Sequence, residues 1–304
     1  MSINSRVTGA DRSLVSGQRG LHELRTPLAY LMTAVRVPFS FLMFCLALLM
    51  ASPQVLAQSE EDLHAANPLM DVMWDYMREQ FIRDEPWQYS AGVQIILPEF
   101  AEDSTQVPVM VRHQIPDARK LILFADLNPI QHIATYEVDA GSLPDIGLQF
   151  RVQQATPVHA LIQDGSGLWH VGRNYVDASG GGCTAPKTEA ASDDWASNLG
   201  QIQGRLFNRS THRLKVQVSH PMDTGLVEGV PAFWLNEITL TDQDATALGH
   251  LNLSSPVSSN PRLTFSFPKA QAPEGLEGYQ LHLKDNDGND FTSPVYPVSG
   301  KEVM

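Results

Sequence analysis

The sequence has 304 residues and a formal net charge of -13, from 21 basic and 34 acidic side chains. Its 43% of hydrophobic residues is normal for a globular protein that buries a core, which excludes a chain that is disordered as a whole. The acidic excess argues against nucleic acid and against an anionic membrane surface as partners, because both would repel it. It favours a basic partner.

An apolar run over residues 38–52 precedes the small and aliphatic residues Val55-Leu56-Ala57. This pattern predicts a signal peptide over residues 1–57 with cleavage after Ala57, and therefore a soluble, exported protein. No Arg-Arg pair precedes the run, which favours the general secretory route. Because the run is short for a bilayer span and acidic residues follow it, a retained membrane anchor is the weaker alternative. Met32 opens a signal peptide of conventional length and is a candidate for the true translation start.

The chain has two cysteines, and the predicted cleavage removes Cys45 and leaves Cys183. Residues 1–57 also contain five Arg and two acidic residues, so the mature chain has 16 basic and 32 acidic residues and a net charge of -16. A single thiol in an oxidising compartment cannot form an internal disulfide. The lone Cys183 therefore predicts either covalent loading of the thiol or a dimer linked through Cys183.

The segment over residues 58–90 begins with acidic residues and continues with apolar residues at helical spacing. Asn67-Pro68 is typical of a helix N-cap followed by proline in the first turn. We expect one amphipathic helix over about residues 68–83. Its Met and Trp side chains are expected to pack against a sheet and not to bind a cofactor.

From residue 91 onward, short apolar runs alternate with Pro, Gly, Asn and Asp, which is the pattern of an all-β protein. The runs expected to form strands are 93–97, 107–113, 120–124, 133–138, 148–152, 158–163 and 169–176, and then 205–207, 215–219, 233–241, 248–253, 262–267, 279–284 and 291–296. Seven strands suit a β-sandwich. We therefore expect two sandwich domains, residues 91–176 and 199–304.

Residues 177–198 are small, polar and acidic, so we place the boundary between the two sandwiches there. Within this segment Gly180, Gly181 and Gly182 precede Cys183, and three glycines give the thiol wide conformational freedom without a bulky neighbour. We interpret the segment as a flexible arm that carries a reactive group; an ordinary linker that contains a cysteine is the alternative. The acidic neighbours disfavour a thiolate and no base is placed to activate it, so a cysteine hydrolase is not expected.

The sequence lacks the motifs of common enzyme and cofactor-binding classes, so we expect no catalytic residue, cofactor or metal. Paired metal-type histidine spacing is missing from the sequence, as are the haem, dinucleotide and serine-hydrolase motifs. The run from Asp285 to Asp290 resembles a calcium loop, but its glycine stands fourth and Tyr296 occupies the position that needs Glu. A hairpin turn is expected there instead. The cluster interpreted as a structured turn is His220, Pro221, Met222, Asp223, Thr224 and Gly225.

These residues resemble those of the SoxYZ sulfur-oxidation carriers, with both partners fused in one chain. The first domain resembles SoxY through Leu123-Phe124-Ala125-Asp126-Leu127-Asn128-Pro129, Ile133-Ala134-Thr135-Tyr136 and the glycine-cysteine arm. The second resembles SoxZ through Val218-Ser219-His220-Pro221-Met222-Asp223-Thr224-Gly225-Leu226, Pro231-Ala232-Phe233-Trp234 and Ser259-Asn260-Pro261-Arg262-Leu263-Thr264-Phe265.

The resemblance implies two immunoglobulin-like sandwiches and a role in thiosulfate oxidation, with Cys183 as the attachment site of a sulfur intermediate. Gly180, Gly181 and Gly182 then correspond to the swinging arm, and the His220 to Gly225 cluster to the surface between the domains. The sequence departs from the family where SoxY ends in a G-G-C-G-G tail, because Thr184-Ala185-Pro186 follows Cys183 here. The arm is tethered at both ends, so a doubled strand has to enter a partner's cleft.

Fused chains of this kind resemble SoxYZ-like carriers that are associated with quinoprotein dehydrogenases, which implies a setting of periplasmic alcohol oxidation. We therefore expect a covalent carrier whose partners are periplasmic sulfur-oxidation enzymes or a quinoprotein dehydrogenase and its cytochrome. The alternative from a different class is a non-covalent acidic accessory protein that binds such a dehydrogenase or a basic cytochrome by charge.

Overall fold

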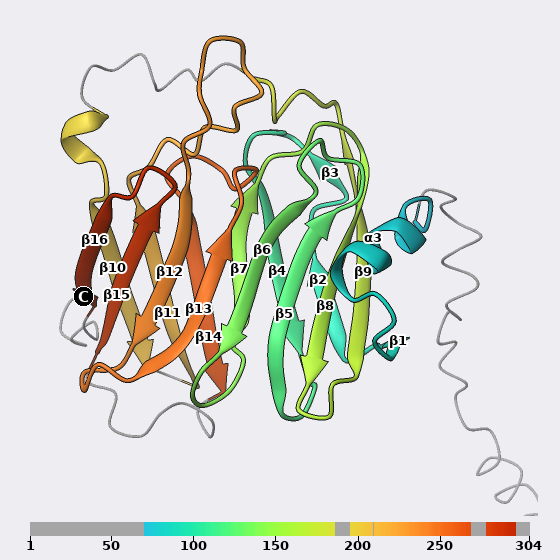
Figure 1. Ribbon diagram of the computed structural model, residues 1–304, viewed down its shortest axis with the longest axis horizontal. Coiled ribbons are helices and arrows are strands. Elements are labelled where there is room, and N and C mark those ends of the chain that lie inside the picture. The colour runs from blue at the N-terminus through green and yellow to red at the C-terminus, as the bar shows by residue number, and fades with distance from the viewer. Residues whose placement is uncertain (1–69, 186–194, 209, 269–277, 296–304) are drawn as a thin grey trace, which may run out of the picture. The chain divides into compact units, whose positions relative to one another are not determined.

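The computed structural model divides the chain into two units, Met1–Ala57 and Gln58–Met304. It describes residues 70–185, 195–208, 210–268 and 278–295, all of which belong to the second unit (Figure 1). The predicted signal peptide and the helix cap at Asn67-Pro68 lie outside the described residues. Within the described residues, no helix is both long and apolar enough to cross a membrane.

Two β-sheets form this unit, which confirms the predicted all-β fold with immunoglobulin-like sandwich character. The first sheet contains, in spatial order, β1 (Trp87–Tyr89), β9 (Trp169–Ala178), β8 (Thr156–Asp164), β5 (Ala118–Ala125), β6 (His132–Val138), β13 (Ala247–Leu253), β12 (Leu235–Thr241), β15 (Tyr279–Asp285) and β16 (Asp290–Val295), and β3 (Phe100–Ala101) pairs with β9. The second sheet contains β10 (Ile202–Asn208), β11 (Thr211–Val218), β14 (Arg262–Pro268), β7 (Asp145–Phe150), β4 (Val107–His113) and β2 (Val93–Ile96).

Each strand predicted from the sequence has a counterpart in these sheets. The sequence did not predict β1 and β3, which pair with β9 in parallel. They have three and two residues, and so short a run shows no alternation that distinguishes it from a loop.

The strands of the first and second halves of the chain pair directly with one another, as Figure 1 shows. In one sheet β6 pairs with β13, where Tyr136 lies opposite Leu251. In the other sheet β7 pairs with β14, where Ile146 lies opposite Phe265. One continuous hydrophobic core runs between the sheets through both halves, and the rings of Tyr136 and Phe265 are 6.1 Å apart within it.

The short helix α3 (Trp74–Phe81) packs on the outer face of the first sheet, as the Met and Trp content predicted. Successive side chains of β5 point to opposite faces of the first sheet. Leu123 therefore faces the core between the sheets, and Phe124 faces the helix. The helix ends close to the predicted position, where Arg83 adopts a positive φ of 51° and donates its amide to the Arg78 carbonyl. It begins later than predicted, after Met73, which provides no side-chain cap.

Candidate functional site

The glycine arm follows β9 and folds back against the first half of the chain. Gly180 and Gly181 have φ angles of +93° and +83°, which residues with a side chain rarely adopt. The amide of Gly181 donates to the Gln153 carbonyl at 3.0 Å, and that of Gly182 donates to the Val152 carbonyl at 2.9 Å. A Cβ atom on Gly182 would collide with the carbonyl oxygen of Ser104. These glycines therefore allow a close approach of two backbones.

Cys183 is buried in this arrangement, with 1% of its surface exposed. Its Sγ–H donates to the Arg151 carbonyl at 3.7 Å, and its amide donates to Oε1 of Gln153 at 3.2 Å. Its own carbonyl accepts a 3.0 Å hydrogen bond from Oγ1 of Thr224. The sequence predicted an unobstructed thiol, and in this conformation that expectation is wrong. Glycine permits freedom and close packing equally, and here the packing prevails.

The buried position sets the protonation state of the thiol. Burial raises the pKa of Cys183 to about 11, although the nearby positive charge of Arg151 opposes the increase. The thiol is therefore protonated at neutral pH and is a poor nucleophile while the arm is docked. Sequence reasoning also expected a disfavoured thiolate, but attributed it to acidic neighbours. Three of them, Glu189, Asp193 and Asp194, lie outside the described residues.

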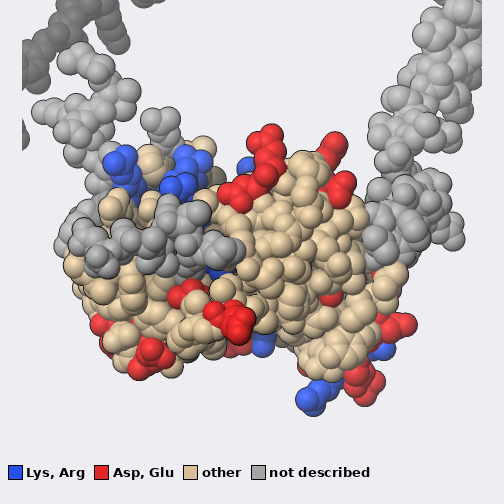
Figure 2. Space-filling model, turned by 90° about the horizontal axis from the view of Figure 1, so that it is seen from above, with Lys and Arg blue, Asp and Glu red and all other residues tan. Residues whose placement is uncertain are grey.

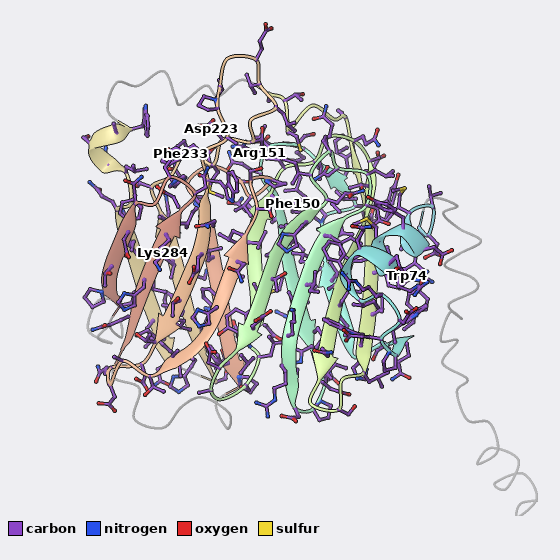
Figure 3. All side chains as sticks on the ribbon, in the orientation of Figure 1. Trp74, Phe150, Arg151, Asp223, Phe233 and Lys284 are labelled. Atoms are coloured by element: carbon purple, nitrogen blue, oxygen red, sulfur yellow. The ribbon has the colours of Figure 1, made fainter. Side chains whose placement is uncertain are left out.

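Arg151, which follows β7, is the charged residue beside the thiol and was not singled out from the sequence. It is 5% exposed, and its Nη2 donates to Oγ of Ser259 at 2.7 Å. Burial lowers the pKa of Arg151, and the charge of Asp223 opposes that decrease, as does the charge of Cys183 once its thiol is ionised. Figure 3 shows Arg151 and Asp223 near each other at the upper end of the sandwich, where the loops of the two halves meet.

Asn128 supports the same loop from the turn after β5. Its Nδ2 donates to the Arg151 carbonyl at 2.8 Å, and its Oδ1 accepts a hydrogen bond from the Gln153 amide at 2.9 Å. It therefore positions Arg151 and Gln153, which both form hydrogen bonds with Cys183. Asn128 belongs to the turn that carries the SoxY resemblance, but the sequence alone does not show what its side chain contacts.

The first part of the predicted cluster builds a buried turn. His220 accepts a hydrogen bond from the Met222 amide at Nδ1, 3.2 Å away, and its Nε2 lies 3.6 Å from Oδ2 of Asp285. Met222 has a positive φ of 54°, and its sulfur accepts a hydrogen bond from the Leu235 amide. Asp285 also accepts the amides of the β15–β16 turn, which confirms the predicted hairpin.

The second part of the cluster reaches the arm. Thr224 bonds Cys183 directly, while the Pro221 carbonyl accepts a hydrogen bond from Oγ of Ser259 at 2.9 Å. Asp223 pairs with Phe233 through two backbone hydrogen bonds, of 2.6 and 3.0 Å. Gly225 follows with a φ of +75°. The structure thus brings Thr224 against Cys183 and the charge of Asp223 near Arg151, whereas His220 and Met222 hold the turn that carries them.

Two protein-family models match the chain: "Sulfur oxidation protein SoxY" over residues 78–183 and "Sulphur oxidation protein SoxZ" over residues 208–295. Among solved structures, the chain is similar to the sulfur carrier protein SoxY from Chlorobium limicola f thiosulfatophilum. The identity is 27% and the TM-score is 0.32, over 35% of this chain and 96% of that one. No curated protein sequence matches the chain.

Proposed function

Because the chain belongs to the SoxY and SoxZ families of sulfur-oxidation proteins, joined in one polypeptide, we propose that it holds a sulfur intermediate covalently on Cys183 in the periplasm. The observation that carries this proposal is the end of the SoxY match at Cys183, the only cysteine among the described residues. The chain holds the cargo, and partner enzymes perform the reactions on it.

The chemistry of loading defines what a partner has to supply. Joining the Cys183 thiol to a thiosulfate dianion forms one S–S bond, releases the thiol proton and removes two electrons. An electron acceptor is therefore needed, and the chain has no group of its own for this purpose among its described residues. We propose that the acceptor is a periplasmic cytochrome or a quinoprotein dehydrogenase system. Figure 2 shows acidic and basic groups on the upper face, and the acidic excess of the whole chain supports contact with a basic partner.

Loading and transfer require the arm to leave its docked position. A thiol with 1% exposure and a raised pKa cannot enter a partner's cleft or attack its substrate. We propose that the arm pivots at Gly180 and Gly181, whose positive φ angles mark a backbone that glycine alone adopts readily. Release breaks the hydrogen bonds from Thr224 and to Gln153, each of which contributes about 1 kcal/mol.

The intact mass of the mature protein, purified without reductant from its native periplasm, tests the proposal. We expect an added mass that a reductant removes and that the Cys183→Ala variant lacks. The size of the added mass identifies the cargo. Purification from cells grown on thiosulfate and from cells grown on an alcohol separates the two physiological settings.

A bare polypeptide mass under both growth conditions would contradict covalent carriage. The accessory-protein alternative would then be tested by measuring binding of the dehydrogenase and its cytochrome at increasing salt. That alternative expects salt to weaken the complex and Cys183→Ala to leave it unchanged.

A further inference from the structure

Arg151 is a buried cation that docking of the arm does not require. The arm uses only its backbone carbonyl, which accepts the Cys183 thiol. Its guanidinium donates to a neutral hydroxyl, that of Ser259, and among the described residues no carboxylate oxygen forms an ion pair with it. Only 5% of the surface of Arg151 is exposed, and burying a guanidinium without a direct counter-ion is costly, because the lost hydration is not replaced by an opposite charge.

While the thiol is empty, the negative charge that acts on Arg151 is not in direct contact with it. Asp223 acts on Arg151 from the second half of the chain, but not at ion-pair distance. Cys183 is protonated at neutral pH and contributes no charge. An anion attached to Cys183 would supply a direct anionic partner at the place where the protein already keeps a cation.

We propose that Arg151 is the counter-charge for the anionic end of a sulfur adduct on Cys183. The inference rests on the proposed carrier function and names the class of cargo that the docked arm favours. A thiosulfonate adduct ends in a sulfonate, whose tetrahedral sulfur carries three oxygen acceptors as a phosphate does, and two of these oxygens suit the fixed N–H fork of a guanidinium. The docked arm then holds anionic cargo more firmly than neutral or cationic cargo.

The contact geometry places the start of an adduct beside Arg151. The sulfur of Cys183 lies 3.7 Å from the carbonyl oxygen of Arg151, and the charge of the guanidinium acts on that thiol, so an adduct on Cys183 begins next to the residue that provides the guanidinium. Nη2 donates to Ser259, which in turn donates to the Pro221 carbonyl, so the second half of the chain holds the fork that the first half carries. The guanidinium donors other than Nη2 have no hydrogen-bond acceptor among the described residues.

Chemically loaded protein tests the inference without any partner enzyme. Tetrathionate loads the thiosulfonate: the Cys183 thiolate attacks a central sulfur, one S–S bond of tetrathionate breaks, and thiosulfate leaves. Alkyl methanethiosulfonates load matched adducts in the same way, with methanesulfinate as the leaving group. We would compare 2-sulfonatoethyl, methyl and 2-(trimethylammonio)ethyl adducts, which are anionic, neutral and cationic.

The measured quantity is the rate at which dithiothreitol removes each adduct, followed by intact mass. The protection of an adduct is the removal rate on protein unfolded in urea divided by the removal rate on the folded protein. This ratio cancels the intrinsic effect of adduct charge on the reaction with dithiothreitol. The wild type is expected to protect the two anionic adducts about tenfold more than the cationic adduct, with the neutral adduct between them. In Arg151→Met the protection of anionic, neutral and cationic adducts should become equal. Arg151→Lys should retain part of the preference for anionic adducts.

Arg262→Met, which removes an exposed cation on β14, is the matched control and should retain the full preference. Equal protection of all adducts in the wild type would overturn the inference, and this result needs no variant to fold. An unchanged preference in Arg151→Met would overturn it as well. Neither result bears on whether native Cys183 carries sulfur, because that is decided by the mass of protein from the periplasm.

Discussion

Oγ1 of Thr224 donates a 3.0 Å hydrogen bond to the carbonyl oxygen of Cys183, so a side chain of the second half of the chain holds the arm that the first half carries. The same hydroxyl accepts the Leu226 amide at 3.2 Å. The docked arm is therefore a contact between the SoxY-like and SoxZ-like halves and not a feature of either alone.

Thr224→Val should loosen the arm. The variant keeps the shape of the side chain but removes the hydrogen bond to Cys183, which contributes about 1 kcal/mol, together with the bond from the Leu226 amide, which does not touch the arm. We expect the rate of Cys183 alkylation by iodoacetamide to rise by about fivefold at neutral pH. Thr292→Val, which removes an exposed contact with His282, is the matched control. Equal rates in wild type and Thr224→Val would show that this bond does not hold the arm.

Gly182→Ala should prevent docking of the arm. The added Cβ would collide with the Ser104 carbonyl, and the Val152 carbonyl would lie 2.6 Å from it. Because burial is what raises the thiol pKa to about 11, the displaced thiol should return toward its ordinary pKa. The pH profile of alkylation checks this, with a rate increase of up to about a hundredfold near neutral pH.

Gly181→Ala separates backbone strain from the collision, because its Cβ would meet no atom within 4 Å and only the positive φ of 83° is strained, so its alkylation rate should rise less than that of Gly182→Ala. A profile for Gly182→Ala that matches the wild type would mean that the arm docks despite the added methyl group.

His132 should make the folded state sensitive to mild acid. It contacts Ser254 at 2.6 Å across the junction of the halves, and burial lowers its pKa to about 4 from an ordinary 6.5. As the pH falls below 6.5 the unfolded chain takes up a proton that the folded chain does not, so the free energy of unfolding decreases until about pH 4. His132→Gln removes this titration. The thermal midpoint of the wild type should fall by roughly 5 °C more than that of the variant between about pH 7 and pH 5.

The two halves should unfold in one transition, because both sheets and the core continue through the β6–β13 and β7–β14 pairs. Phe265→Ala removes a buried ring that lies beside Tyr136 and should cost about 3–5 kcal/mol. Calorimetry should show one peak that moves to lower temperature as a whole. Phe100→Ala, at a side chain that is 49% exposed, is the control and should leave the peak in place. Two peaks, with only one shifted by Phe265→Ala, would mean that the halves unfold independently.

The strands could be read from the sequence because alternation is a local signal. In β11, for example, buried His212, Leu214, Val216 and Val218 alternate with side chains that face away from the core, and this period identifies a half-buried strand without knowledge of its neighbours. The same signal does not specify which strand pairs with which. The junction of β6 with β13 joins residues more than a hundred positions apart, and both halves had been expected to form sandwiches of their own.

The amino-acid sequence by itself determined the lone Cys183, the three glycines before it and the strand pattern of two related halves. Only the tertiary structure decided that the thiol is buried, that Arg151 is its charged neighbour and that Thr224 holds its carbonyl. The physical reason is that glycine has no side chain and so encodes no preference between a free arm and a close backbone contact. That choice depends on Ser104, Val152 and Gln153, whose places beside the arm are set by the pairing of strands and not by any local pattern.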